Sequence, residues 1–288
     1  MNRTIAYDGT PLSLVGRSVE VRTRAPDFTV VNRDLEEMGL EGFSNKIKVF
    51  TFFPSLDTPV CDIQVREFNK RGFTHDNDIV CIGISKDLPF AQKRFCETFN
   101  IKNVDLVSDY RYSSFGINYG VLIREWNLLS RGVIIVDRKN TIRYIQLASE
   151  IMNQPDYEEA AHALEEVVKN PELPIPDATP YECTPCEGEV SPLPRAMVTA
   201  MMVKYPGWEL VDDRKIVKHL RFKDFVGAKF FLDIISNVAR EQGHHPSFTL
   251  NYNRLKITLT THAAGGLTEN DFIMGGIINE IEKKTRPR

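Results

Sequence analysis

Residues 47–61 read IKVFTFFPSLDTPVC. The first seven of these residues are a short apolar, β-branched and aromatic run that Pro54 ends, which predicts a buried strand. After Cys61, apolar side chains recur at roughly helical spacing, at Ile63, Val65, Phe68 and Phe73. We therefore expect a strand, a short loop and a helix, with Cys61 at the start of that helix.

The flanking sequence extends this unit into a layered domain. The further predicted elements are strands at 79–85, 132–136 and 141–146 and helices at 87–99 and 157–168. Asp87 is expected to cap the first of these helices, with Pro89 in its first turn. Strands alternating with helices in this order predict an α/β thioredoxin-like fold for residues 1–170.

Length and composition suggest two soluble domains. A chain of 288 residues exceeds the size that one hydrophobic core usually serves. Its 42% hydrophobic and 26% charged residues are ordinary for a globular protein, and a formal net charge of -3 argues against nucleic-acid binding. No apolar run is long enough to span a membrane, and residues 1–14 lack a signal-peptide pattern. We expect a cytoplasmic protein with no nucleic-acid or membrane partner.

Cysteine chemistry is the first functional signal. Five cysteines are an odd number, which does not suggest a secreted disulfide framework. A cysteine at a helix N-terminus feels unpaired N–H groups and the positive end of the helix dipole, so Cys61 should favour the thiolate, the form that attacks the O–O bond of a peroxide. Thr58 can offer its hydroxyl to the sulfur or the peroxide, and Pro54 would shield the site from water.

Pro54, Thr58 and Cys61 form a P-x-x-x-T-x-x-C motif. With the stretches FFPSLDTPVCDIQVREFN, ISKDLPFAQKRFC and SRGVIIVD, it resembles the bacterial thiol peroxidase subfamily of peroxiredoxins along nearly all of residues 1–168. The resemblance implies that Cys61 becomes a sulfenic acid and that Cys96 condenses with it to a disulfide, which thioredoxin reduces. It also implies that Arg131 stabilises the thiolate and the leaving oxygen.

The residues alone leave other roles open. Cys96 lies beside Phe95 and Phe99 in a predicted helix, where it could simply pack in the core. Arg131 could be a solvated loop charge. Cys81 stands in the middle of a predicted buried strand and is interpreted as inert core.

A proline-rich segment separates the two halves. Residues 171–194 hold seven of the sixteen prolines and cannot sustain a helix or a central strand. We expect a linker at 171–191, and it contains Cys183 and Cys186 in a Cys-x-x-Cys motif. Its role stays open between a structural or incidental pair, a redox pair and part of a zinc site.

The second half, 192–288, predicts a different fold. Predicted helices begin at 194, 225 and 268, and predicted strands cover 208–211, 216–222, 248–252 and 255–261. This order, α-β-β-α-β-β-α, predicts an α+β domain with one four-stranded antiparallel sheet and helices on one face. Thr268 and Asp271 resemble a capping box at the last helix, and an open sheet edge favours dimerisation.

Half of the six histidines fall within nineteen residues of this second half, as His244, His245 and His262. His244 and His245 follow a helix and His262 is expected to end a strand, so all three could meet at one rim. Histidine both donates and accepts protons near neutral pH. No nucleophile stands nearby, so proton transfer such as the elimination of water fits best. The alternatives are a purely structural role, in the core or at the surface, and a three-histidine metal site.

The segments EQGHHP (241–246), YN (252–253), ITLTTH (257–262) and GL (266–267) resemble pterin-4a-carbinolamine dehydratase across 192–285. The resemblance implies that His244 and His262 act as acids that expel the 4a-hydroxyl, while His245, next to Pro246, holds the pterin.

We therefore expect a bifunctional enzyme that acts on peroxides and on a pterin carbinolamine, with thioredoxin as reductant. It should need no metal and no cofactor, and should form a homo-oligomer, a dimer or tetramer. The alternative is a peroxidase whose C-terminal domain is a non-catalytic dimerisation or binding module.

Overall fold

The computed structural model describes residues 4–71, 73, 78–170, 183 and 191–285. Contacts divide the chain into two units, Met1–Ala178 and Thr179–Arg288. The predicted linker at 171–191 falls outside the described residues, apart from Cys183 and Ser191. Among residues with a described position, no helix has the length and apolar character needed to cross a membrane.

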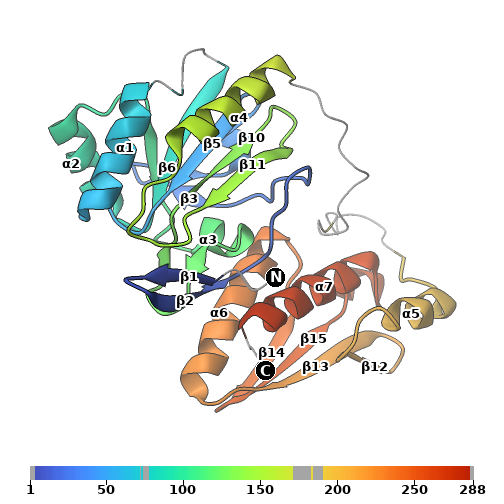
Figure 1. Cartoon of the computed structure of the whole chain (residues 1–288). Coiled ribbons are helices and arrows are strands. Elements are labelled where there is room, and N and C mark those ends of the chain that lie inside the picture. The colour runs from blue at the N-terminus through green and yellow to red at the C-terminus, as the bar shows by residue number, and fades with distance from the viewer. Residues whose placement is uncertain (1–3, 72, 74–77, 171–182, 184–190, 286–288) are drawn as a thin grey trace. The chain divides into compact units, whose positions relative to one another are not determined.

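Three parallel strands form the middle of the first unit (Figure 1). β5 (Ile47–Phe52) pairs with β6 (Ile79–Ser85), which pairs with β7 (Asp105–Ser108). β5 and β6 match the predicted strands to within one residue, whereas β7 was not predicted. All six residues of β5 are buried because side chains cover both faces of the sheet, so the strand has an apolar run instead of an alternating pattern.

Antiparallel strands extend this sheet at both edges, giving the order β11-β10-β5-β6-β7-β3-β4. β10 (Gly132–Val136) pairs with β5 and with β11 (Ile142–Leu147). At the other edge, the short strands β3 (Val30–Val31) and β4 (Glu37–Met38) follow β7. The mixed seven-stranded sheet with its helices confirms the predicted thioredoxin-like fold class.

The described residues of the first unit form four α-helices: α1 (Pro59–Arg71), α2 (Pro89–Phe99), α3 (Ser114–Asn118) and α4 (Tyr157–Lys169). A short 3-10 helix, η1 (Leu40–Phe43), precedes β5. A second sheet, in the order β1-β2-β8-β9, was not predicted; its strands are Thr4–Tyr7, Thr10–Val15, Leu122–Ile123 and Leu128–Leu129.

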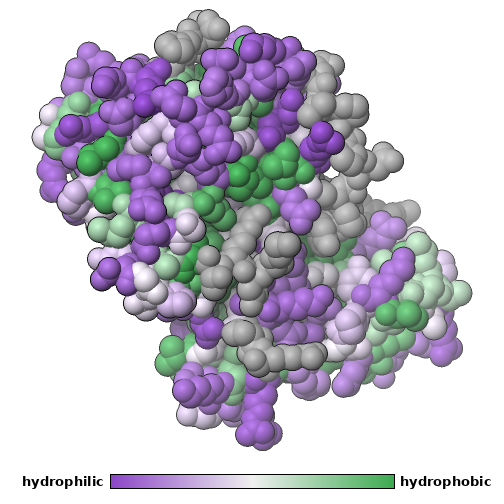
Figure 2. Space-filling view, viewed as in Figure 1, coloured by the Kyte–Doolittle hydropathy of each residue, from purple (hydrophilic) through white to green (hydrophobic). Residues whose placement is uncertain are grey.

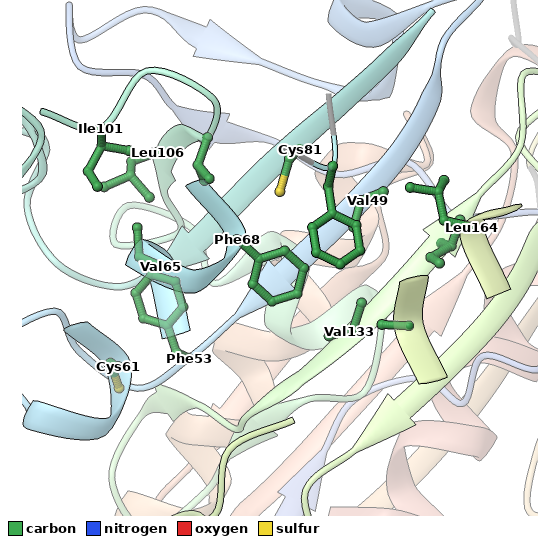
Figure 3. Packing of buried hydrophobic residues seen from close by; sticks show 14 of the residues in the cluster. Val49, Phe53, Cys61, Val65, Phe68, Cys81, Ile101, Leu106, Val133 and Leu164 are labelled. Atoms are coloured by element: carbon green, nitrogen blue, oxygen red, sulfur yellow. The ribbon is translucent and has the colours of Figure 1, made fainter. Parts of the chain in front are cut away.

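One apolar cluster joins α1, α2 and α4 to the central strands. Figure 3 shows its packing, with Cys61 at the edge of the cluster and Cys81 among the side chains within it. A separate group of aromatic rings surrounds Phe115 of α3, with ring centroids at 4.4 Å (Tyr119), 5.5 Å (Phe28), 5.6 Å (Phe50) and 5.8 Å (Phe52). Aromatic rings in such contact stabilise the interior beyond the area they bury.

The second unit contains the predicted series of elements: α5 (Arg195–Met202), β12 (Glu209–Val211), β13 (Lys215–Arg221), α6 (Phe225–Glu241), β14 (Ser247–Asn251), β15 (Arg254–Leu259) and α7 (Glu269–Thr285). The four strands form one antiparallel sheet in the order β12-β13-β15-β14, which confirms the predicted fold class. A 3-10 helix, η2 (His262–Ala264), lies between β15 and α7.

Local sequence explains the boundaries of these elements. Asp212 and Asp213 both adopt positive φ angles, 53° and 55°, between β12 and β13, as the central residues of a tight hairpin turn do. The Asp224 carboxylate accepts a hydrogen bond from the Gly227 N–H at 2.8 Å and caps α6. Gly243 has a φ of 60° just after α6, a conformation that favours glycine.

Hydrophilic residues cover most of the face shown in Figure 2, and apolar residues lie in small groups among them. The exposed large apolar side chains include Phe90 and Phe99 of α2, at 66% and 41% exposure. Phe90 therefore contributes little to the core, although it stands on the same helix as the buried Phe95.

Phe115→Ala should lower the free energy of unfolding of the first unit by about 3–5 kcal/mol, because it removes a fully buried ring from the centre of the aromatic group. The control Phe90→Ala should change it by less than about 0.5 kcal/mol, since that ring is exposed. Urea unfolding followed by the fluorescence of Trp126, in a Trp208→Phe background, reports on the first unit alone. Equal losses in the two variants would contradict the assignment of this core.

Candidate active sites

The loop after β5 leads into α1, and Cys61 lies in the first turn of this helix, as predicted. α1 begins at Pro59, whose fixed φ suits a first helical position. The Cys61 N–H donates to the Thr58 carbonyl at 3.1 Å, and the Thr58 N–H donates to the Ser55 carbonyl at 3.1 Å. Pro54 is buried, and the Cys61 side chain is fully buried. The thiol is therefore held in a tight turn at a helix N-terminus.

Two side chains donate hydrogen bonds to the Cys61 sulfur. The Thr58 hydroxyl lies 2.8 Å from Sγ, and Nη2 of Arg131 lies 3.2 Å from it. Arg131 is only 1% exposed, so it is not a solvated loop charge. A buried guanidinium and a hydroxyl therefore both face one sulfur, and hydrogen bonds from a charged donor are stronger than those from a neutral one. The structure thus brings Thr58, Cys61 and Arg131 together.

Gln64 is a site residue that sequence reasoning missed. Its Oε1 accepts a hydrogen bond from Nη1 of Arg131, while its Nε2 donates to Thr51 Oγ1 at 2.7 Å and to the Phe52 carbonyl at 3.4 Å. Arg131 Nε donates to the Ile151 carbonyl at 2.7 Å. These contacts leave Nη2 to face the sulfur. The sequence did contain a sign of this role: Gln64 is a polar residue three positions after Cys61, on the same face of the helix as the apolar Val65 and Phe68.

The prediction that Asp87 caps α2 is wrong. The residue at the N-cap is Leu88, and no side chain caps this helix. The Asp87 carboxylate instead accepts hydrogen bonds from Ser55 Oγ at 2.7 Å and the Leu56 N–H at 2.8 Å, so it anchors the loop that precedes Cys61. These partners lie 32 and 31 residues away along the chain, a relation that local pattern does not contain.

Cys96 and Cys81 are both buried, at 5% and 1% exposure. Burial raises the pKa of the Cys96 thiol, and the nearby Arg33 opposes that shift. Burial also raises the pKa of Cys81, which packs inside the apolar cluster and has no polar partner among the described hydrogen bonds (Figure 3). Cys61 and Cys96 are thiols in this structure, so their pairing stays a prediction.

A pocket of about 430 Å³ lies between the start of α1 and α2. Its lining includes Leu56, Thr58 and Asp62 on one side and Arg94, Phe95 and Phe99 on the other. Thr58 therefore faces both the pocket and the Cys61 sulfur. A molecule in this pocket would contact Thr58, whose hydroxyl hydrogen-bonds to the Cys61 sulfur.

In the second unit, His244 is buried against Asp271. Its Nε2 lies 2.8 Å from Asp271 Oδ1, and the two side chains are 7% and 0% exposed. Oδ2 of the same carboxylate accepts from Thr261 Oγ1 and from the Thr268 N–H, each at 2.8 Å. The Thr268 contact is one half of the predicted capping box at the start of α7; the Asp271 N–H donates to the Thr268 backbone carbonyl instead of its side chain. The sequence indicated Asp271 as a cap but missed its contact with His244.

The other two histidines are placed differently. His245 is exposed and is followed by the buried Pro246. His262 is also exposed, and it does not end a strand as predicted, because β15 ends at Leu259 and His262 begins η2. The hydrogen bond from Thr261 to Asp271 still ties the segment of His262 to the partner of His244. Among the described residues no cluster has the composition of a metal site, and no described hydrogen bond joins the three histidines to one another.

Cys183 contacts the segments that carry His244 and Asp271. Its N–H donates to Gln242 Oε1 at 2.9 Å, and its thiol faces the Asn270 carbonyl at 3.7 Å. Cys186 lies outside the described residues, so the role of the Cys-x-x-Cys motif stays open.

Comparisons with known proteins cover both units. The family model for Redoxin matches residues 20–161, and the one for pterin 4 alpha carbinolamine dehydratase matches residues 191–281. A thiol peroxidase of Aquifex aeolicus is 42% identical over 171 residues, 58% of this chain and 100% of that protein. One of Bacillus subtilis is 41% identical over 165 residues, 57% of this chain and 98% of that protein. The crystal structure of a peroxiredoxin-like protein from Aquifex aeolicus is similar with a TM-score of 0.55 and 40% identity, covering 58% of this chain and 98% of that one.

Gln64→Leu should slow the oxidation of Cys61 by hydrogen peroxide about 10- to 100-fold, because Arg131 loses the acceptor that aims Nη2 at the sulfur. Stopped-flow measurement of the first oxidation gives the rate constant. Gln92→Leu is the matched control: Gln92 is also a fully buried amide, but it bonds to Ser85 and Val107. The same loss in both variants would mean that Gln64 acts through stability only.

Proposed function

The chain belongs to the thiol peroxidase family and continues into a pterin 4a-carbinolamine dehydratase domain, and on that basis we propose a cytoplasmic bifunctional enzyme. Its first activity is the thioredoxin-dependent reduction of hydrogen peroxide and organic hydroperoxides. Its second is the dehydration of 4a-hydroxytetrahydropterin to quinonoid dihydropterin. The observation that carries the first is the pair of donors on the Cys61 sulfur; the buried His244–Asp271 pair supports the second.

The peroxidase step begins with the Cys61 thiolate. The sulfur attacks the terminal peroxide oxygen, the S–O bond forms, the O–O bond breaks, and the leaving alkoxide or hydroxide takes up a proton. Arg131 and Thr58, which face the sulfur in the resting site, are placed to stabilise charge that moves from sulfur to oxygen. The product on the enzyme is the sulfenic acid of Cys61.

Cys96 then resolves the sulfenic acid. Its thiolate attacks the Cys61 sulfur, the S–O bond breaks, the leaving hydroxide takes up a proton to become water, and a Cys61–Cys96 disulfide forms, which a dithiol of the thioredoxin class reduces. Because both thiols are buried, we expect the segments that carry them to rearrange before the disulfide forms. The hydrogen bonds that Asp87 accepts from Ser55 and Leu56 hold the loop before Cys61 against such a movement.

In the dehydratase step, the C4a–O bond breaks, the N5 proton is lost and a C4a=N5 double bond forms. Nε2 of His244 is hydrogen-bonded to Asp271, so Nδ1 is the ring nitrogen that remains to contact a substrate. His244 and His262 supply protons to the leaving hydroxyl, and the exposed His245 contacts the pterin. The alternative, a non-catalytic binding or dimerisation module, gives no reason for a buried His–Asp pair beside two exposed histidines.

Cys61→Ser should abolish peroxide consumption with thioredoxin and thioredoxin reductase, because the nucleophile is gone. Cys96→Ser should oxidise Cys61 at the wild-type rate and then stop at the sulfenic acid, which a dimedone adduct detects by mass spectrometry. Thioredoxin-linked turnover by the Cys61→Ser protein would refute the site. An unchanged steady-state rate in Cys96→Ser would refute the resolving role.

His245→Ala should slow the enzymatic decay of 4a-hydroxytetrahydropterin at least about tenfold, because a substrate contact is lost. The decay is followed by the absorbance of the quinonoid product. Peroxide turnover by the same variant serves as the control for folding. If the wild-type chain does not accelerate the decay, and if His245→Ala changes nothing, the binding-module alternative is correct.

A further inference from the structure

The class of product that the first proposed reaction forms is the class of substrate that the second one uses. A thiol peroxidase converts a hydroperoxide ROOH into the alcohol ROH. The dehydratase substrate is an alcohol at C4a of a tetrahydropterin, and the corresponding hydroperoxide is the 4a-hydroperoxytetrahydropterin. We propose that this pterin hydroperoxide is a substrate of the Cys61 site, so that the product of the first unit is the substrate of the second. This inference rests on the proposed function of both units.

The pocket beside Cys61 has the size and character for such a substrate. Its volume of about 430 Å³ is within the range of ordinary small-molecule sites, roughly 300–1,000 Å³. Phe95 and Phe99 on α2 and Leu56 on the opposite side supply apolar surface for a planar bicyclic ring. Thr58 lines the same pocket and donates to the Cys61 sulfur, so a peroxide on the ring edge would lie next to the hydroxyl that contacts this sulfur.

Asp62 offers a polar contact that matches a pterin. The Asp62 side chain lines the pocket and is 26% exposed; its Oδ1 has no hydrogen-bond partner among the described residues, while its Oδ2 lies 3.5 Å from Arg66. A carboxylate oxygen without a partner is an acceptor that a bound donor can satisfy. The 2-amino group and N3–H of a pterin are adjacent donors of the kind a carboxylate accepts. Arg94, across the pocket, is a donor for the 4-carbonyl oxygen.

The two reactions follow one another with atoms and electrons balanced. The Cys61 thiolate takes the terminal oxygen of the C4a–OOH group, the O–O bond breaks, and the C4a alkoxide gains a proton to become the 4a-hydroxypterin. Cys96 and the dithiol reductant return Cys61 to the thiolate, with loss of water. The second unit then removes water from the 4a-hydroxypterin. The supplying reaction must add dioxygen to C4a of a tetrahydropterin, as an oxygen-using hydroxylase or autoxidation does.

The test uses the full chain and the 4a-hydroperoxide of 6,6-dimethyltetrahydropterin, prepared cold and mixed with reduced protein in the presence of catalase. Catalase removes hydrogen peroxide that the pterin releases spontaneously. In the His245→Ala variant we expect one oxidised Cys61 for each pterin consumed, with 4a-hydroxypterin accumulating. If catalase prevents the oxidation of Cys61, the chain uses only released hydrogen peroxide, and the proposal is overturned.

Two control substrates separate this proposal from the function on which it rests. tert-Butyl hydroperoxide, which is not a substrate of catalase, must oxidise Cys61, and 4a-hydroxytetrahydropterin added directly must be dehydrated by the wild-type chain. Failure of either control counts against the proposed function. Success of both, with no direct reaction of the pterin hydroperoxide, counts against this inference alone.

Pocket variants test the binding site. Phe99→Ala should lower the ratio of the rate constants for the pterin hydroperoxide and tert-butyl hydroperoxide about tenfold, because an apolar contact to the ring is lost. Phe90→Ala is the matched control, since Phe90 stands on the same helix but does not line the pocket. An equal ratio in the two variants would place the pterin elsewhere and overturn the assignment of this pocket.

Discussion

The buried guanidinium of Arg131 is the constraint around which the first unit is organised. A cation at 1% exposure must have partners for its charge and its N–H groups, and it finds them in the Cys61 sulfur, the Gln64 side chain and the Ile151 carbonyl. The sulfur is the one of these partners that can become an anion. The contact that satisfies the buried cation is therefore also the one that places a positive charge beside the proposed nucleophile.

The second unit has a comparable arrangement with the charges reversed. Asp271 is a fully buried carboxylate whose Oδ2 is occupied by Thr261 and Thr268, which leaves Oδ1 for His244. In both units, neutral buried groups hydrogen-bond to one charged side chain and so hold its orientation. That charged side chain in turn hydrogen-bonds to the residue expected to react. Removing the neutral group should therefore cost reaction rate as well as stability.

Local pattern was sufficient for much of the fold. The strand–loop–helix at 47–71 and the series of elements in the second unit could be predicted because apolar periodicity, caps and turns are local. In the first unit, β7 and the second sheet (β1-β2-β8-β9) were missed, since their strands of two to six residues carry little pattern. Gln64 and Asp87 were missed or misassigned for another reason: their partners Arg131 and Leu56 lie 67 and 31 residues away along the chain. Contacts at such distances depend on the folded topology.

The central claim is that Cys61 is the thiol that peroxide oxidises and that Cys96 resolves it. The most direct measurement is a mass-spectrometric disulfide map of the full chain after one equivalent of hydrogen peroxide under non-reducing conditions. We predict a Cys61–Cys96 cross-linked peptide, with Cys81, Cys183 and Cys186 still available for alkylation. A bond from Cys61 to another cysteine, or an oxidised Cys183–Cys186 pair with Cys61 still reduced, would contradict this claim.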